Sequence, residues 1–186
     1  GHDGRWLMVD CGVTFEETLQ GNEVQMPDPH FISERAKSLV GIVATHAHMD
    51  HIGALPHFAD QFGCPIYTTP FTAAVLAPKL REARSKAIVN IVHPGQSLAL
   101  GPFQLTWLPI THSTPETNGL FIETAAGNIV HTADWKIDPT PLVGQGFDRP
   151  LWQSLASKGV DAVVCDSTNA MNLGHSLSEA DLYEGC

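Results

Sequence analysis

The sequence predicts an α/β protein built from two sheets with helices outside them. Strand candidates outnumber helix candidates, and the two kinds follow each other in mixed order along the 186 residues. Residues 39–44 are continuously apolar, as expected for a strand that is buried on both faces. Short apolar stretches flank Gly101-Pro102 and the run 125–127, and this pattern indicates hairpins. A chain that contains both a fully buried strand and hairpin strands, with helices between them, favours a layered arrangement of sheets and helices.

The first half of the chain contains four predicted strands and two predicted helices. A helix is expected at 52–62, where apolar residues recur at helical spacing and Gly63 marks the end. A second helix is expected at 71–83, with a bend at Pro78. The long polar segment 13–35, which contains prolines, is expected to be a loop that has a function or is mobile. The strands are predicted at 6–9, 39–44, 65–68 and 88–92.

The second half contains hairpins and one more helix. Strands are predicted at 97–100 and 103–108, and again at 120–124 and 128–132, on either side of the two turns. A helix is expected at 151–157, before Gly159, and residues 160–165 are expected to form a last buried strand.

Composition and charge limit the classes of function. The chain is 43% hydrophobic and 16% charged, which is typical of a folded globular protein. No apolar run approaches the roughly 18 residues that a membrane helix needs, and we expect no membrane partner. The formal charge is −10, and two divalent cations would reduce it to about −6. This sign argues against a domain that holds nucleic acid by surface charge. A polyanionic substrate would have to be held by metals or by another part of the protein.

The four cysteines, Cys11, Cys64, Cys165 and Cys186, form no CxxC pair. Widely spaced cysteines of this kind are typical of free thiols in a reducing compartment. We therefore predict a cytoplasmic protein.

The segment His46-Ala47-His48-Met49-Asp50-His51 is the most informative feature of the sequence. It follows the apolar run 39–44 and places three imidazoles and a carboxylate within six residues. His46 and His48 are two residues apart, so in extended chain both point to one side and can bind one metal. Asp50 and His51 follow as the chain turns into a helix and can bind a second. Imidazole and carboxylate are the ligands that catalytic zinc prefers.

Two further candidates follow later strands. His112 comes after the strand 103–108, and Asp134 comes after the strand 128–132. Each by itself would be read as structural, but the histidine cluster makes them candidate metal ligands, and Asp134 has two oxygens with which to bridge two ions. Two divalent metals at about 3.5–4 Å lower the pKa of a shared water from 15.7 toward about 7. Asp50 or Asp134 is the candidate catalytic residue that orients the hydroxide or accepts its proton.

The motifs resemble the metallo-beta-lactamase fold superfamily and, within it, ribonuclease J of the beta-CASP nuclease branch. The histidine cluster, with Asp10 before it and His112 and Asp134 after it, resembles the superfamily. Four stretches resemble ribonuclease J: Val9–Val13 (VDCGV), Thr45–Pro56 (THAHMDHIGALP), His131–Pro141 (HTADWKIDPTP) and Asp166–Ala170 (DSTNA), the last followed by Ser178-Glu179. The DWKIDPTP and DSTNA sequences are the parts that point to ribonuclease J within the superfamily.

The resemblance implies a four-layer alpha-beta-beta-alpha sandwich, incomplete here, with two zinc ions (or Mn²⁺ or Mg²⁺) between the sheets. His46, His48 and His112 would bind one metal, Asp50 and His51 the other, and Asp134 would bridge them. Asp10 would orient the loop through hydrogen bonds. Ser167, Thr168 and Asn169 would line the edge of the substrate cleft, or else only form a turn at the end of a strand.

The sequence also departs from the ribonuclease J pattern. That family has an additional late histidine on the second metal and a beta-CASP domain inserted after a region like DSTNA. Residues 1–186 match the N-terminal portion of the metallo-beta-lactamase domain, and the insert would begin near or after 180. The family's first strand is also unmatched, which would leave an exposed sheet edge and makes a homo-oligomer an open alternative.

The resulting hypothesis is a zinc-dependent ribonuclease that hydrolyses RNA phosphodiester bonds, with RNA as the partner of the full-length protein. One alternative is another hydrolase of this fold that cleaves a lactone, a thioester or a beta-lactam. A second is a partial domain that binds metal without turnover. Lys136 could pair with a phosphate or with Asp138, and we predict the ion pair with Asp138. The four tryptophans are predicted to be core or wall residues. The other histidines are predicted to have surface or packing roles, with His131 and His175, which lie nearest the motifs, as the first candidates for exceptions.

Overall fold

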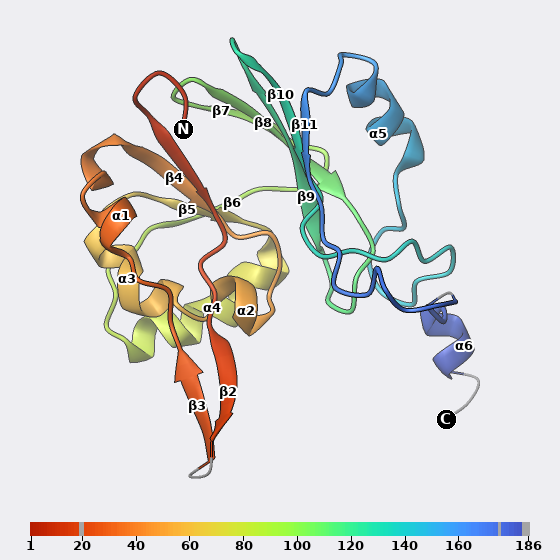
Figure 1. Cartoon of the computed structure of the whole chain (residues 1–186), viewed down its shortest axis with the longest axis horizontal. Coiled ribbons are helices and arrows are strands. Elements are labelled where there is room, and N and C mark those ends of the chain that lie inside the picture. Colours follow the sequence, from red (N-terminus) through yellow and green to blue (C-terminus); the bar gives the residue numbers. More distant parts are fainter. Residues whose placement is uncertain (19–20, 175, 184–186) are drawn as a thin grey trace. The chain divides into compact units, whose positions relative to one another are not determined.

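The structure is a computed structural model that describes residues 1–18, 21–174 and 176–183. It contains two compact units (Figure 1). Unit 1 comprises Gly1–Val92 with Leu100–Pro102, and unit 2 comprises His93–Ala99 with Phe103–Cys186. Each unit has one main sheet with its own helices. None of the described helices is both long enough and apolar enough to cross a membrane.

The main sheet of unit 1 is parallel and has the strand order β1-β4-β5-β6. Its central strand β4 (Leu39–Val43) is buried at every position except Val40, as its uninterrupted apolar sequence predicts. Because β1 pairs with β4 in parallel, with Val9 opposite Val43, the segments that follow these two strands leave the sheet at the same edge. The strands are β1 (Trp6–Val9), β4, β5 (Ile66–Thr68) and β6 (Val89–Ile91).

The helices of unit 1 pack their apolar faces into a core with the sheet. Residues 52–62 do not form one helix as predicted: α2 (Met49–Ile52) ends at Gly53, and α3 (Leu55–Phe62) begins after Ala54. Pro56 explains the break, because it has no N–H to donate and fits only the first turn of a helix. Gly63, with φ +64°, ends α3 as predicted. The remaining helices are α1 (His30–Ser33), the 3-10 helix η1 (Ala36–Ser38) and α4 (Pro70–Glu82), which continues through Pro78.

The segment 13–35 is not a loop throughout, so that prediction was wrong in part. It contains an antiparallel hairpin, β2 (Thr14–Thr18) and β3 (Gly21–Gln25), which extends away from the rest of unit 1 (Figure 1). Phe15 lies opposite Val24, and both side chains are more than half exposed. The described side chains of the hairpin are all exposed, so they do not show the alternation of buried apolar residues by which strands are recognised in a sequence.

The main sheet of unit 2 has five strands in the order β11-β10-β9-β8-β7. Strands β8, β9 and β10 are antiparallel neighbours, so β8 and β10 run in the same direction with β9 between them. The predicted turns are present, and Gly127 takes the φ of +146° that the turn between β9 and β10 requires. The strands are β7 (Ser97–Leu100), β8 (Phe103–Pro109), β9 (Asn118–Thr124), β10 (Gly127–His131) and β11 (Ala162–Val164).

Helix α5 (Arg149–Ala156) covers one face of this sheet. The Asp148 side chain accepts a hydrogen bond from the Leu151 N–H at 3.0 Å and caps the helix. Leu155 belongs to a buried cluster with Leu108 and Phe121, and Trp152 packs against this cluster. Helix α6 (Glu179–Tyr183) is the last described element.

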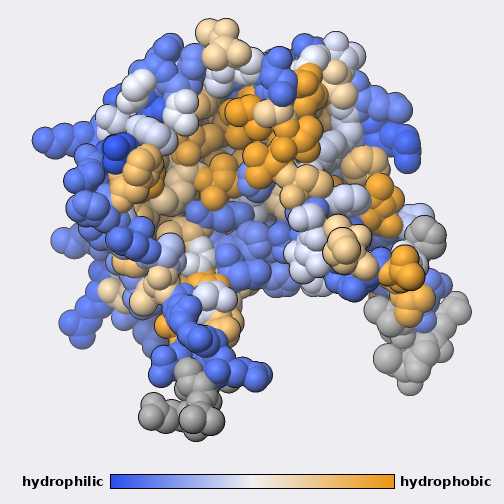
Figure 2. Space-filling model, in the orientation of Figure 1, coloured by the Kyte–Doolittle hydropathy of each residue, from blue (hydrophilic) through white to orange (hydrophobic). Residues whose placement is uncertain are grey.

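Strand β11 lies at the edge of the sheet and is exposed, so the prediction of a buried strand at 160–165 was wrong. Val163 is 60% and Val164 52% exposed. The apolar sequence correctly indicated a strand, but it carried no information about which strand would have only one neighbour. Apolar side chains reach the surface in both units, and patches of them interrupt the hydrophilic surface in Figure 2.

Candidate metal centre

In unit 1, Asp10 organises the loop that carries the histidine cluster. Asp10 directly follows β1 and has a φ of +62°, and the loop follows the neighbouring strand β4. One carboxylate oxygen accepts a hydrogen bond from the Thr45 N–H at 2.7 Å. The other accepts one from the Thr45 hydroxyl at 2.8 Å and lies 2.7 Å from Nδ1 of His51. Asp10 therefore fixes both ends of the segment between Thr45 and His51.

These contacts also determine the orientation of two imidazole rings. The Thr45 hydroxyl donates to Asp10, so it can accept from Nδ1 of His46, which lies 3.0 Å away. Asp10 likewise favours the His51 tautomer with a proton on Nδ1. In both rings the lone pair is then on Nε2, as in metal-binding histidines that donate their other ring N–H to an outer partner.

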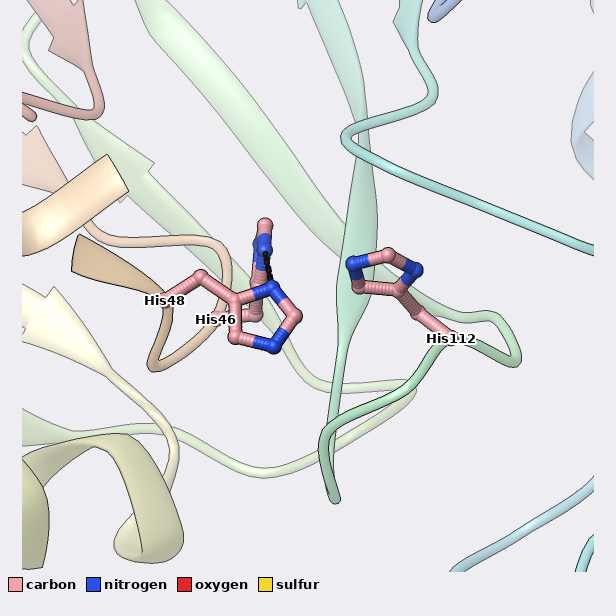
Figure 3. A group of neighbouring side chains, drawn as sticks. All are labelled: His46, His48 and His112. Atoms are coloured by element: carbon pink, nitrogen blue, oxygen red, sulfur yellow. Dashed lines mark hydrogen bonds between the residues drawn. The ribbon is translucent and has the colours of Figure 1, made fainter. Parts of the chain in front are cut away.

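The three histidines of the loop are packed against one another. Nε2 of the fully buried His46 lies 3.1 Å from Nδ1 of His48, the contact drawn in Figure 3. The ring centroids of His46 and His51 are 4.0 Å apart. Asp50 is the exposed member of the group, and its Oδ2 lies 3.6 Å from Nε2 of His51. The lone pairs of His46 Nε2 and His48 Nδ1, which are 3.1 Å apart, repel each other unless a proton or a cation lies between them.

Gly12 allows the turn after β1 to pack directly on α2. A Cβ atom at position 12 would lie 1.6 Å from the carbonyl oxygen of Asp50. The Cys11 N–H donates to the His51 carbonyl at 2.7 Å, and the Ala54 N–H donates to the Cys11 carbonyl at 3.0 Å. The main chain around the cluster is therefore held by the segment after β1, which the sequence motif itself does not include.

In unit 2, His112 and Asp134 lie together although they come from different strands. His112 follows β8, on the loop shown in Figure 3, and Asp134 follows β10. Nε2 of His112 is 3.7 Å from Oδ2 of Asp134. Ala133, with a φ of +54°, turns the chain just before Asp134. An imidazole and a carboxylate at this separation are suited to bind a common cation or a pair of neighbouring ones.

The donor set fits divalent metal ions in both units. All six candidate ligands are imidazole or carboxylate donors: His46, His48, Asp50 and His51 in unit 1, and His112 and Asp134 in unit 2. Among the described residues, five of the six belong to groups of donor atoms close enough to hold a metal ion, and Asp50 belongs to none of these groups. Asp10 and Thr45 lie behind the rings, where outer hydrogen-bond partners of metal ligands are usually found.

The three residues predicted to line the substrate edge, Ser167, Thr168 and Asn169, line a cavity of about 390 Å³ in unit 2. Its wall also includes Trp135, which is 36% exposed, and Lys136. The hydroxyl and N–H of Thr168 both donate to the Asp166 carboxylate. Burial would raise the pKa of Asp166, but these hydrogen bonds hold it below its usual value.

Asp138 is a buried carboxylate that the sequence singled out only as the partner of Lys136. That ion pair is confirmed at 3.3 Å. The carboxylate also accepts hydrogen bonds from the Ser178 hydroxyl at 2.7 Å and the Glu179 N–H at 2.9 Å. The Ser178 hydrogen bond is the main reason that the pKa of Asp138 lies well below its usual range. This network joins the DWKIDPTP stretch to Ser178-Glu179.

The described cysteines are free thiols, as predicted. Cys11 and Cys64 are buried, and burial raises the pKa of each to about 11, with the charge of Asp10 adding to the effect at Cys11. Cys165 is exposed. The predictions for Cys186 and His175 lie outside the described residues.

Comparison with known proteins places the chain in a family. The model of the "Metallo-beta-lactamase superfamily" matches residues 1–164, which include all six candidate ligands. The chain belongs to the metallo-beta-lactamase superfamily.

Three solved structures share this superfamily fold with the chain at 14–16% sequence identity. Zn²⁺-bound PqqB from Methylobacterium extorquens has a TM-score of 0.57 and covers 88% of this chain and 56% of its own. A protein of unknown function from Enterococcus faecalis has a TM-score of 0.62, with coverage of 97% and 48%. Rm3 metallo-beta-lactamase has a TM-score of 0.52, with coverage of 86% and 76%.

Within the metallo-beta-lactamase superfamily, the chain is similar to proteins named ribonuclease J. The protein from Sinorhizobium meliloti is 41% identical over 97% of this chain. Those from Mycobacterium tuberculosis and Helicobacter pylori are 37% and 33% identical over 97% and 95%. The chain spans 32%, 33% and 26% of the length of these three relatives. The resemblance to ribonuclease J noted in the sequence is thus confirmed.

Proposed function

We propose that this chain is the metal-binding part of a ribonuclease J-like enzyme that hydrolyses phosphodiester bonds in RNA. The observation that carries the proposal is the 41% identity to a ribonuclease J over 97% of the chain, which extends well beyond the histidine cluster. The motifs His131–Pro141 and Asp166–Ala170 lie within the matched region and include Asp134.

We assign the ligands to two metal ions, with zinc as the first choice and Mn²⁺ or Mg²⁺ as alternatives. His46, His48 and His112 would hold one ion, Asp50 and His51 would hold the other, and Asp134 would serve both. The orientation of His46 and His51 by Asp10 supports this assignment, because it directs the Nε2 lone pairs of both rings away from the supporting carboxylate.

The metals would supply a water of lowered pKa and positive charge opposite the phosphate oxygens. The protein groups have separate tasks in this scheme. Asp50, which is largely exposed, or Asp134 accepts the proton of the attacking water. Ser167, Thr168 and Asn169 contact the RNA at the cavity that they share with Trp135. With a net charge of −10 on the chain, the metals or another part of the protein would offset the repulsion of the phosphates.

Replacing Asp134 with alanine tests the proposal. Asp134→Ala should empty at least one of the two metal positions and abolish cleavage of 5′-monophosphorylated RNA, because a bridging ligand serves both ions. Metal content is measured by elemental analysis and cleavage by gel electrophoresis, in parallel with Asp3→Ala, which removes an exposed carboxylate from unit 1. Full metal content in Asp134→Ala would remove Asp134 from the site.

The acidic charge favours a second candidate, a hydrolase of the same fold that acts on a lactone, thioester or beta-lactam. A carbonyl substrate without a string of phosphates would suffer less repulsion from a chain of charge −10. A panel of nitrocefin, a lactone, a thioester and 5′-monophosphorylated RNA separates the two. Cleavage of RNA alone supports the first proposal, and cleavage of a carbonyl substrate alone supports the second.

A partial domain that binds metal without turnover is the third candidate. It predicts bound metal without activity on any member of the panel. The cytoplasmic location and the homo-oligomer stay predictions, and size-exclusion chromatography tests the latter.

A further inference from the structure

The two loops that carry His112 and Asp134 are not neighbours in the sheet of unit 2. Strand β9 separates β8 from β10, so the ends of the two ligand-bearing strands are about 10 Å apart. Ladder hydrogen bonds cannot connect these two ends, because each strand pairs with β9. Yet the ring of His112 and the carboxylate of Asp134 approach to 3.7 Å. Another interaction must therefore hold the loops in position.

Thr111, the residue before His112, makes that connection. Its carbonyl accepts a hydrogen bond from the Lys136 N–H at 2.8 Å. Its hydroxyl donates to the Lys136 carbonyl and accepts from the Asp138 N–H at 3.0 Å. The residue is only 5% exposed, so water does not compete effectively for these groups. Three hydrogen bonds from one residue thus join the His112 loop to the segment just after Asp134.

The segment that Thr111 binds is itself held in place through Asp138. Asp138 accepts hydrogen bonds from the Ser178 hydroxyl, the Glu179 N–H and the Thr140 N–H and pairs with Lys136. Its backbone N–H, which donates to Thr111, therefore belongs to a segment that is held at several points. The loop that Thr111 binds cannot shift without disturbing this buried carboxylate.

We propose that Thr111 is a positioning residue that sets the separation of His112 and Asp134 and thereby the affinity of the chain for the metal ions that these two residues bind. This rests on the proposed role of His112 and Asp134 as ligands. Thr111 touches neither metal nor substrate in this scheme and acts only through the two loops. Its side chain is needed as a hydroxyl group because one partner, the Lys136 carbonyl, is an acceptor and the other, the Asp138 N–H, is a donor.

The test is the zinc affinity of the purified 186-residue chain, measured by competition with a chromophoric chelator. Thr111→Val keeps the shape of the side chain but removes the hydroxyl, and should weaken zinc binding by about 10- to 100-fold. Thr111→Ser should restore it. The matched control is Thr106→Val, since Thr106 is a buried threonine of β8 whose hydroxyl has one partner, the Ser97 hydroxyl at 2.8 Å. Thr106→Val should lower the melting temperature without changing zinc affinity.

Zinc affinity in Thr111→Val equal to that of the parent chain would overturn the proposal, as would equal losses in Thr111→Val and Thr106→Val. A second measurement needs no variant: in the metal-free chain, the amide protons of Lys136 and Asp138 should exchange as slowly as those in the centre of β9. Fast exchange at both would contradict the inference even if Thr111→Val fails to fold. His112→Ala distinguishes a failure of the proposed metal centre from a failure of the proposed role of Thr111. Unchanged zinc affinity in His112→Ala would contradict the metal centre itself.

Discussion

In unit 1 the candidate ligands His46, His48, Asp50 and His51 come from one loop of six residues, whereas in unit 2 His112 and Asp134 come from two strands with β9 between them. The first group is close together because of chain connectivity. It needs support mainly in orientation, which Asp10 supplies through Thr45 and His51. The second group has no such connectivity and depends on cross-links between loops.

The difference shows that two kinds of supporting residue are needed in one fold. Unit 1 uses a charged acceptor behind the rings, and that acceptor touches the ligands or their neighbours directly. Unit 2 uses a neutral hydroxyl that binds main-chain groups, with the buried carboxylate of Asp138 behind it. Changes in unit 1 should therefore alter ligand orientation, and changes in unit 2 should alter ligand separation.

The largest effect is expected from Gly12→Ala in unit 1. The new Cβ would lie 1.6 Å from the Asp50 carbonyl oxygen, so the segment after β1 would have to leave α2. We expect a loss of at least about 4 kcal/mol in the free energy of unfolding, measured with urea, and a loss of bound metal, because the loop that carries His46, His48, Asp50 and His51 would lose its support. Gly146→Ala is the control, because its Cβ would meet only Pro141 at 3.9 Å. A stable Gly12→Ala variant with normal metal content would show that connectivity alone maintains the loop.

A smaller and more specific effect is expected from Asp10→Asn. The amide has one acceptor oxygen and no charge, so it cannot hold both Thr45 and the His51 ring as the carboxylate does. Metal affinity should fall by about 10- to 100-fold, as measured by chelator competition.

Asp60→Asn is the matched control for Asp10→Asn, since Asp60 also accepts hydrogen bonds from a hydroxyl and a main-chain N–H, those of Ser85 and Lys86. Equal affinities in Asp10→Asn and Asp60→Asn would mean that the rings of unit 1 need no oriented support.

The smallest effect is expected from Asp138→Asn in unit 2 and should depend on pH. The Ser178 hydrogen bond is the first of the causes that lower the pKa of Asp138 in the folded chain, and the unfolded value is about 3.9. The stabilisation is therefore complete above the unfolded pKa and is lost as the pH falls toward the folded pKa. The difference in melting temperature between the parent chain and Asp138→Asn should be largest near pH 7 and should shrink below about pH 4.

Two other carboxylates form hydrogen bonds in this region. Glu179 accepts from the Leu142 N–H and Asp181 from the Ser178 N–H, but both are present in parent and variant alike. The difference between the two melting curves thus reports Asp138 alone. A difference that is constant from pH 7 to pH 3 would mean that the Asp138 carboxylate makes no charge-dependent contribution to the anchor in unit 2.

The sequence predicted most strands because apolar runs and turn residues act locally. Strand β4 is recognisable from its own five residues, and Gly63 and Gly127 mark ends and turns through their backbone freedom. The predictions failed where the neighbouring elements determine burial. Strand β11 is apolar yet exposed at the sheet edge, and none of the described side chains of the hairpin β2–β3 is buried. The break between α2 and α3 was in principle visible at Pro56, but helical spacing hid it.

The sequence by itself determined the chemistry of this protein: which imidazoles and carboxylates are present, and that four of them share one loop after a buried strand. The resemblance to a known family pointed to Asp10 as a supporting residue, but only the tertiary structure showed its contacts and identified Thr111 and Asp138 as supports. Asp10 lies 35 residues from Thr45, and Thr111 lies 27 residues from Asp138, so no local pattern connects either pair. Such contacts depend on strand order and on the parallel or antiparallel pairing of β1 with β4 and of β8, β9 and β10, which arise from the packing of the whole sheet.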